Sequence, residues 1–533
     1  MPIYDSGDGA DGALTITSSQ FWADTSYLCT AVNGTALTVT AATAPLGIRA
    51  GDEILLIHLQ GSATTTTTAG IIHTGKWEIL SVASTGANLI NTTETASNSI
   101  LDSGGKVMAI RVPNYTNFII QTGAILRATP FKAIAGSSGI IAFKAKSSCT
   151  INGLIFANSA GFTCVSTDPG NNTGSYGGDS YGGAGGAGAG TGVDGSGGGG
   201  GGYIAAGGDG WAGGGAGGST EGSSNNGGAG GGGGHDGTGF GGAGGGGYGS
   251  AGGDGRTTLG IANGAGLGGG VFGIDSLNRI YLGPAGGCGG QANIPADRAA
   301  GGTGGGIVWI SARYLTVAGT GIQCNASQAG TGNTAHSAGG GGSAGGSIYI
   351  KTQSGALGTI LVKADSALAK TGKGDLLAAS GGAGSVGRIA VRYDDSITGT
   401  TFPTYTSIIE DFSIQGEYSQ SFTDTMTVSD APSWTPGKNF LDAITLTDTI
   451  TRSHTFMRTF NDSVSITGET LAKAIEKALI ADGITMTDSI TQAIAAIRTF
   501  NDTINLTDTS SQTGPGTATV AEVVLRMMMG MGR

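Results

Sequence analysis

Short runs that are either alternately apolar and polar or continuously apolar fill the amino-terminal part of the chain. They occupy residues 35–41, 51–59, 75–83 and 105–113, and glycine, asparagine or serine separates them. Alternation between turn residues is the pattern of β-strands that bury one face. The pattern therefore predicts a small barrel or sandwich over residues 1–112, which we interpret as an attachment module.

A different pattern follows, and it occurs twice. Residues 138–162, "SGIIAFKAKSSCTINGLIFANSAGF", match residues 305–327, "GGIVWISARYLTVAGTGIQCNAS", and weaker copies extend to residue 396. A unit of this size cannot bury its apolar face alone, so its repetition predicts stacking as in a β-solenoid. We expect the first rungs at 113–165 and the second rungs at 305–396.

The alternation within the two copies predicts which side chains share a face of this scaffold. We expect Ile141, Phe143 and Ala145 to share one face of the first copy. We expect Ile307, Trp309 and Ser311 to share the corresponding face of the second copy.

Glycine dominates the segment between the two copies. Residues 166–304 form a Gly-rich block, and residues 171–270 hold about half of the chain's 107 glycines. Because its ends are fixed by matching scaffold pieces, we expect extended, polyproline-II-like glycine strands packed side by side, with flexible loops as the alternative. Breaks in the glycine runs are candidate receptor contacts, with buried packing as the alternative role: Tyr203, Ile204, Trp211, His235, Asp236, Phe240 and Tyr248.

A 20-residue repeat covers residues 420–510, after a linker at 397–419 and before a tail at 511–533 to which we assign no function. In each unit an aspartate follows two residues after an apolar anchor, and an alternating strand comes next. Asp448 and Asp488 stand where a helix N-cap would, so we expect strand-plus-short-helix units that form a rigid spacer. An all-strand unit and a partner-binding array are the alternatives. The predicted repeat core is Phe422, Phe440, Phe460, Ile480 and Phe500.

Composition and charge narrow the possible partners. Only 12% of the residues are charged and the formal net charge is −11, so no basic stripe for nucleic acid is present. No apolar run is long enough to span a membrane. The amino terminus lacks a basic segment followed by an apolar one, so we expect release without a signal peptide, as for a virion part freed by lysis.

The residues that could carry chemistry are scattered. The five cysteines and five histidines show no metal-ligand spacing, so we expect no metal and no cofactor. Cys149 and Cys164 are either two buried thiols or a bridge, and His58 and His73 have structural roles. The adjacent Asp394 and Asp395 would point to opposite faces of a strand, unlike a converging glycosidase pair. The prediction is therefore that the chain is not an enzyme.

Two resemblances add to this interpretation. The segments "GDEILLIHLQG", "GKWEILSVASTGANLI" and "SGIIAFKAKSSCTINGLIFANSAGF" resemble the repeating core of Gly-rich bacterial surface proteins, including those annotated for adventurous gliding motility. In composition the Gly-rich block is similar to tailed-phage adhesins whose tip is a sandwich of polyglycine-II helices. Both resemblances imply an extracellular, adhesive role.

The sequence thus predicts a mainly β, elongated protein: a β-solenoid-like scaffold with an inserted polyglycine block, an amino-terminal β module and a carboxy-terminal repeat array. We interpret it as a phage-like tail fibre or receptor-binding adhesin on the virion surface. A cell-surface adhesion or matrix protein of a bacterium or archaeon is the alternative. The expected partners are a host receptor or glycan, and further copies of the chain or a fibre base protein.

Overall fold

The structure is a computed structural model, and its contacts divide the chain into two units, residues 1–416 and 417–533. It describes residues 6–23, 25–40, 45–61, 74–97, 105–132, 137–164, 229–231, 241–256, 265–289, 299–330, 338–368, 370–371 and 379–409, and six short strands between 447 and 507. These residues contain strands and no helix, which confirms a mainly β protein. None of them belongs to a helix that could cross a bilayer.

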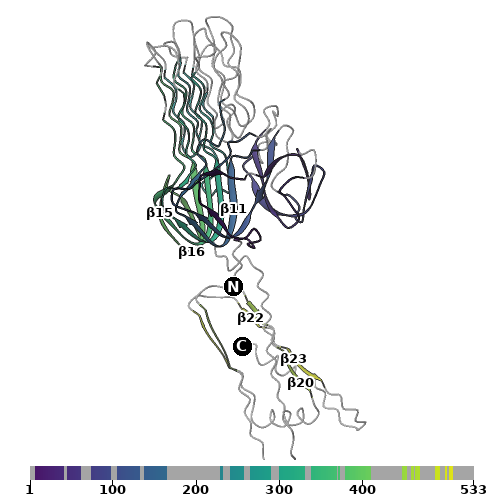
Figure 1. The fold of residues 1–533 in the computed structure, drawn as a ribbon. Coiled ribbons are helices and arrows are strands. Elements are labelled where there is room, and N and C mark those ends of the chain that lie inside the picture. The colour runs from purple at the N-terminus through teal and green to yellow at the C-terminus, as the bar shows by residue number, and fades with distance from the viewer. Residues whose placement is uncertain are drawn as a thin grey trace, which may run out of the picture. The chain divides into compact units, whose positions relative to one another are not determined.

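Six antiparallel strands close into a barrel in the order β3-β4-β7-β6-β5-β8, drawn in dark purple beside the sheet (Figure 1). Their bounds are Ser26–Asn33, Ala36–Val39, Leu89–Thr92, Trp77–Gly86, Glu53–Gln60 and Lys106–Val112. The barrel encloses a core of its own that includes Leu37, Ile54 and Ile90, all fully buried. The predicted "barrel or sandwich" is therefore a barrel.

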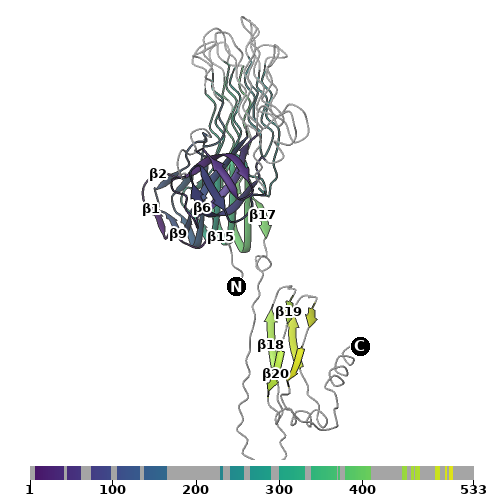
Figure 2. The same ribbon diagram turned by 90° about the vertical axis from the view of Figure 1, so that its right-hand side faces the viewer.

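Eleven parallel strands form one curled sheet, arranged as two series joined by tight turns (Figure 2). The first series contains β1 (Leu14–Ile16), β9 (Asn114–Ile120), β11 (Ile140–Ile151) and β13 (Ile307–Val317). The second series contains β2 (Gln20–Phe21), β10 (Ile125–Arg127), β12 (Leu154–Phe156) and β14 (Gly321–Gln323). The long strands β15 (Ser347–Lys363) and β16 (Arg388–Phe402) run through both series, and β17 (Thr406–Ile409) pairs with β16.

The two series share a core, because one cluster of buried residues takes side chains from both. It includes Phe143 and Ile310 of the first series, and Ile155 and Ile322 of the second. The first series is also buried on its other face, where Trp309 packs among barrel and glycine-segment residues. The second series is covered on its inner face only.

The predicted register between the two copies is wrong by one residue. Ile141 pairs with Val308, not with Ile307, and Phe143 pairs with Ile310, not with Trp309; Ala145 pairs likewise with Ala312, not Ser311. Because successive side chains of a strand point to opposite faces, this slip moves Ile307 and Trp309 to the opposite face from Ile141. The alternation did not reveal it, since both faces of the first series are buried and apolar.

Three predicted boundaries also differ from the structure. Strands β1 and β2 belong to the curled sheet although they lie within the predicted module 1–112. Strands β16 and β17 extend the sheet to Ile409, into the predicted linker 397–419. Glycine segments at 338–346 and 379–387 join those of the predicted block 166–304 through backbone hydrogen bonds.

The glycine segments hydrogen-bond to one another without forming strands. Five consecutive N–H groups, from residue 242 to 246, donate in turn to Arg256, Gly339, Gly231, Gly253 and Gly342. The carbonyl oxygens of the same five residues accept in turn from Gly266, Gly382, Gly287, Gly269 and Ser385. Residues three apart donate to the same neighbouring segment, and their carbonyl oxygens accept from a second shared segment. Three donor directions and three acceptor directions therefore bond this segment to six neighbouring segments, which run side by side (Figure 1).

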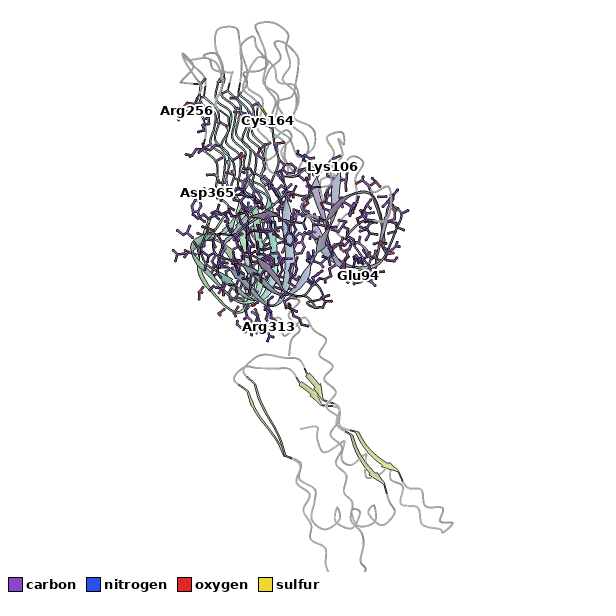
Figure 3. All side chains as sticks on the ribbon, in the orientation of Figure 1. Glu94, Lys106, Cys164, Arg256, Arg313 and Asp365 are labelled. Carbon is purple, nitrogen blue, oxygen red and sulfur yellow. A yellow bond between two sulfur atoms is a disulfide. The ribbon has the colours of Figure 1, made fainter. Side chains whose placement is uncertain are left out.

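The disulfide differs from the pairing considered from the sequence. Cys164 is bonded to Cys288, which lies 124 residues further along the chain, and Cys149 is a buried free thiol. The bridge ties the end of the segment after β12 to the glycine segment 283–289, and Cys164 lies among the glycine segments, away from the strands of the sheet (Figure 3). No sequence spacing pointed to this pair.

The second unit shows parallel strand pairs 40 residues apart. Strands β18 (Thr447–Arg452) and β21 (Thr487–Gln492) pair, as do β19 (Arg458–Phe460) with β22 (Arg498–Phe500) and β20 (Ser463–Thr467) with β23 (Thr503–Thr507). Asp448 and Asp488 lie inside β18 and β21, so the predicted helix N-caps at these positions are wrong. Pairing therefore skips one 20-residue unit. The predicted helical segment at 469–480 lies outside the described residues, so the choice between a strand-plus-helix and an all-strand unit stays a prediction.

Candidate binding surface

Among the described residues, the second series presents an outer face that is half-buried to exposed, as do the later halves of the first-series strands. Inward-facing Leu126, Ile155, Ile322 and Val362 of successive strands are fully buried in the shared core. The next residue on each strand must then point outward. The paired register aligns these outward residues in one row, the outer row: Phe21, Arg127, Phe156, Gln323, Lys363 and Phe402.

The outer row combines aromatic rings with two cations. Phe21 and Phe402, at its two ends, are 63% and 43% exposed, and the four residues between them are half-buried. The Arg127 guanidinium lies 4.8 Å from the centroid of the Phe156 ring, a cation–π distance. The row thus brings three aromatic rings, two cations and one amide onto a single strip.

Beside the outer row, the amide side chains of Asn158 and Asn325 connect successive strands at the turn that follows them. Asn158 Nδ2 donates to Gln323 Oε1 at 3.1 Å, and Asn158 Oδ1 accepts from the Asn325 N–H at 2.7 Å. Asn325 Oδ1 accepts from the Asp365 N–H at 2.9 Å. These bonds fix the spacing of the turns and hold Gln323 in place, which keeps the strip rigid.

The sequence analysis did not single out any residue of the outer row. A signal was present, because "ILRA", "LIFA" and "LVKA" share a pattern in which one variable residue precedes a small one. That variable position is Arg127, Phe156 and Lys363. Aligning the second strands of each repeat, rather than the first, would have found it.

Tyr248, predicted as a candidate receptor contact, is fully buried. Its ring stacks on Phe272 at 4.7 Å and meets Tyr281 edge-on at 6.0 Å, and its hydroxyl lies 2.7 Å from Ser347 Oγ. Arg388 lies over the ring, and burial raises the pKa of the Tyr248 phenol to about 12. A side chain with no exposed surface contacts no receptor, so Tyr248 has the alternative role, joining the glycine segments to the sheet.

The other candidate contacts lie outside the described residues: Tyr203, Ile204, Trp211, His235, Asp236 and Phe240. Among the predicted repeat-core residues, Phe422, Phe440 and Ile480 also lie outside them. Phe460 and Phe500 pair directly across β19 and β22. That the five anchor residues of the repeats form one apolar core stays a prediction.

An aromatic cluster lies where the barrel meets the sheet. Trp77 of β6 makes edge contacts with Trp309 and Tyr349, which stack on each other at 6.0 Å, and Arg392 lies over the Tyr349 ring. Trp309 and Tyr349 are 3% and 4% exposed. The cluster therefore belongs to the interior, where it fixes the barrel against the outer face of the first series.

A second polar strip crosses the first series where Arg313, Gln353 and Asp395 adjoin. Arg313 Nε donates to Gln353 Oε1 at 3.0 Å, and Gln353 Nε2 donates to Asp395 Oδ2 at 3.0 Å. Tyr314 beside them is 45% exposed, with the Arg313 guanidinium over its ring. The side chains of this strip bond to one another, and its cation is matched by a carboxylate.

In the part of the chain that the structure describes, no three His, Cys, Asp or Glu side chains gather as a metal site would require. His58 is fully buried, with Nε2 at 3.1 Å from the Gln60 carbonyl oxygen, and His73 lies outside the described residues. Burial raises the pKa of the Cys29 thiol to about 12, so this thiol is not a nucleophile at neutral pH. The absence of a cofactor stays a prediction.

Comparison with known proteins identifies no family for this chain. No protein family and no curated protein matches the sequence. One solved structure that resembles the chain is the Gp54 tailspike of Acinetobacter baumannii bacteriophage AP22 in complex with A. baumannii capsular saccharide. The sequence identity is 11% and the TM-score 0.14; the likeness covers 74% of this chain, which spans 58% of the tailspike's length.

This comparison corrects one prediction. The sequence analysis predicts that the chain is not an enzyme, yet the structure it is compared with is a tailspike that holds a saccharide. We therefore withdraw the prediction that the chain is not an enzyme. At a TM-score of 0.14 the likeness assigns no activity in its place.

Proposed function

We propose that the chain is an adhesive structural protein of an extracellular fibre or fibre tip, of the tailed-phage type, that binds a receptor or glycan on a host cell surface. The same construction would serve a cell-surface adhesion or matrix protein of a bacterium or archaeon, which is the second candidate. In both, the folded body presents a rigid surface to another cell.

The hydrogen bonding of residues 242–246 carries this proposal. Donors and acceptors that repeat every third residue fit a helix with three residues per turn, which is the geometry of polyproline II. We therefore propose that the glycine segments form a polyglycine-II lattice. A Cβ atom at Gly244 would overlap the Leu267 carbonyl oxygen, which accounts for the glycine at this position.

The curled sheet supports the same function. We propose that its strand pairs are rungs of a β-solenoid, because Ile120 aligns with Ile151 in the first series and Leu126 with Ile155 in the second. A stack of this kind grows along one axis and needs no globular core. It supplies a stiff base for the glycine lattice, and we propose that the 20-residue repeats extend it as a spacer.

Adsorption of the full chain to cells tests the proposal. We expect saturable binding of the labelled protein to some members of a panel of bacterial cells and isolated envelopes, and loss of this binding after periodate oxidation of the envelope glycans. Reducing ends are measured in the same samples, so that binding and cleavage are separated. Absence of saturable binding to every cell and envelope would contradict an adhesive role.

A further inference from the structure

We propose that the outer row binds an acidic polysaccharide laid across the strands of the second series. This inference rests on the proposed adhesive function and names the chemistry of its partner. The glycan would run along the stacking direction, so that successive sugars meet successive strands.

Charge is the first argument. The chain carries a formal net charge of −11, yet the six positions of the outer row hold two cations, Arg127 and Lys363, and no carboxylate. Among the described residues, neither cation forms an ion pair. The nearest acid along the strand, Asp365, accepts a hydrogen bond from the Ser366 N–H at 2.7 Å. An anionic ligand would therefore meet a local charge opposite to that of the whole protein.

Shape is the second argument. Neighbouring strands are about 4.8 Å apart, so Arg127 and Lys363, three strands apart, are separated by roughly 14 Å along the row. One strand spacing is comparable to the length of one sugar ring, so the two cations would meet acidic groups a few sugars apart. The exposed rings of Phe21 and Phe402 offer flat apolar faces at the two ends, and Gln323 between the cations offers an amide.

The rest of the sheet fits such a ligand less well. The outer face of the first halves of the first-series strands is covered by the barrel and by the segment that contains Tyr281. The strip of Arg313, Gln353 and Asp395 is internally bonded and holds a carboxylate that would repel an anion. The outer row combines open aromatic faces with two cations and holds no carboxylate of its own, whereas the strip beside Tyr314 includes Asp395.

Polygalacturonate and its methyl-esterified form, matched in length, are suitable probes because they differ only in the charge of the sugar. The test compares the full natural chain with R127Q/K363Q. The control R49Q/K106Q removes one arginine charge from the turn before β5 and one lysine charge from β8, where Lys106 is labelled in Figure 3. A third variant, Phe21→Ala, removes an exposed ring while leaving the charge unchanged.

We expect R127Q/K363Q to bind polygalacturonate about tenfold more weakly than the natural chain at low salt, and the control to bind unchanged. The natural chain should prefer the acid to the ester, and added salt should reduce this preference. Phe21→Ala should weaken binding of acid and ester by the same factor, because a ring face contacts sugar regardless of charge.

Several outcomes would overturn the inference. These are no binding of polygalacturonate by the natural chain, equal loss in R127Q/K363Q and the control, or equal affinity for acid and ester. Binding of a thymidine oligonucleotide as tightly as polygalacturonate would assign the row to nucleic acid instead. If R127Q/K363Q binds cells as the natural chain does, the adhesive function stands and this inference fails. If the natural chain binds no cell, the adhesive function fails, and the polysaccharide titration still shows whether the outer row binds an acidic polysaccharide.

Discussion

Replacing Gly244 by alanine tests whether the glycine segments are a packed lattice. The new Cβ would overlap the carbonyl oxygen of Leu267, a backbone atom that cannot rotate away. The segment that carries Leu267 must then move. It accepts a hydrogen bond from Gly231 N–H at 2.9 Å, and it donates to the segment of Gly244 through Gly266 and Gly269 at 2.9 and 2.8 Å.

The size of the effect follows from these bonds. Weakening three of them costs about 3 kcal/mol at roughly 1 kcal/mol each, and overpacking adds about 1 kcal/mol or more. The lower chain entropy of unfolded alanine offsets about 0.4–1 kcal/mol of this. We therefore expect a local loss of about 3 kcal/mol, which corresponds to a more than hundredfold rise in the opening constant.

Hydrogen–deuterium exchange, read on peptides from 241–256 and 265–289, measures this loss directly. Gly253→Ala is the matched control, because its Cβ would lie 3.1 Å from the nearest atom, the Ala383 nitrogen, and would require only a small adjustment. Protection of β11 and β13 should stay unchanged in both variants. Equal exchange in G244A and G253A, or unprotected glycine segments in the natural chain, would refute the packed lattice.

Two further predictions concern the contacts between the glycine segments and the sheet. Breaking the Cys164–Cys288 bond by reduction, or in C164A/C288A, should lower the free energy of unfolding by about 5 kcal/mol, because the bond closes a loop with a separation of 124 residues. Denaturant titration measures this, and reductant should not affect the double variant. The raised pKa of Tyr248, about 12, means that the folded state keeps a proton that the unfolded chain loses near pH 10. Stability should therefore fall by about 2 kcal/mol between pH 10 and pH 12, and Tyr248→Phe should show a shallower fall over this range in thermal unfolding.

The barrel strands could be predicted because each is a short run between turn residues, alternating in β6 and almost continuously apolar in β5 and β8, which are buried on both faces. Residues 51–59, 75–83 and 105–113 correspond to β5, β6 and β8, and glycine or serine marks their ends. Alternation is informative where burial alternates. The first series lacks this property: Ile140 and Ile141 are both fully buried, on opposite faces, and so the one-residue slip was invisible.

Other features depend on contacts between distant residues. Cys164 and Cys288 meet only because the glycine segment 283–289 returns to the sheet, and nothing in their spacing indicates this. Tyr248 stands among glycines in the sequence, where an aromatic residue suggests an exposed contact, yet it packs against Phe272 and Tyr281. The outer row was missed because its residues share no type, only a register.

The threefold rotation of the bonds around residues 242–246 also constrains how this gene can change length. Deleting one residue from such a segment would move each following residue into the place of its predecessor, which keeps the N–H directions but turns every following side chain by a third of a turn, toward a different neighbouring segment. Deleting three would return each side chain to the neighbour it faced before. Insertions and deletions inside the packed segments should therefore be tolerated best when they add or remove a multiple of three amino acids.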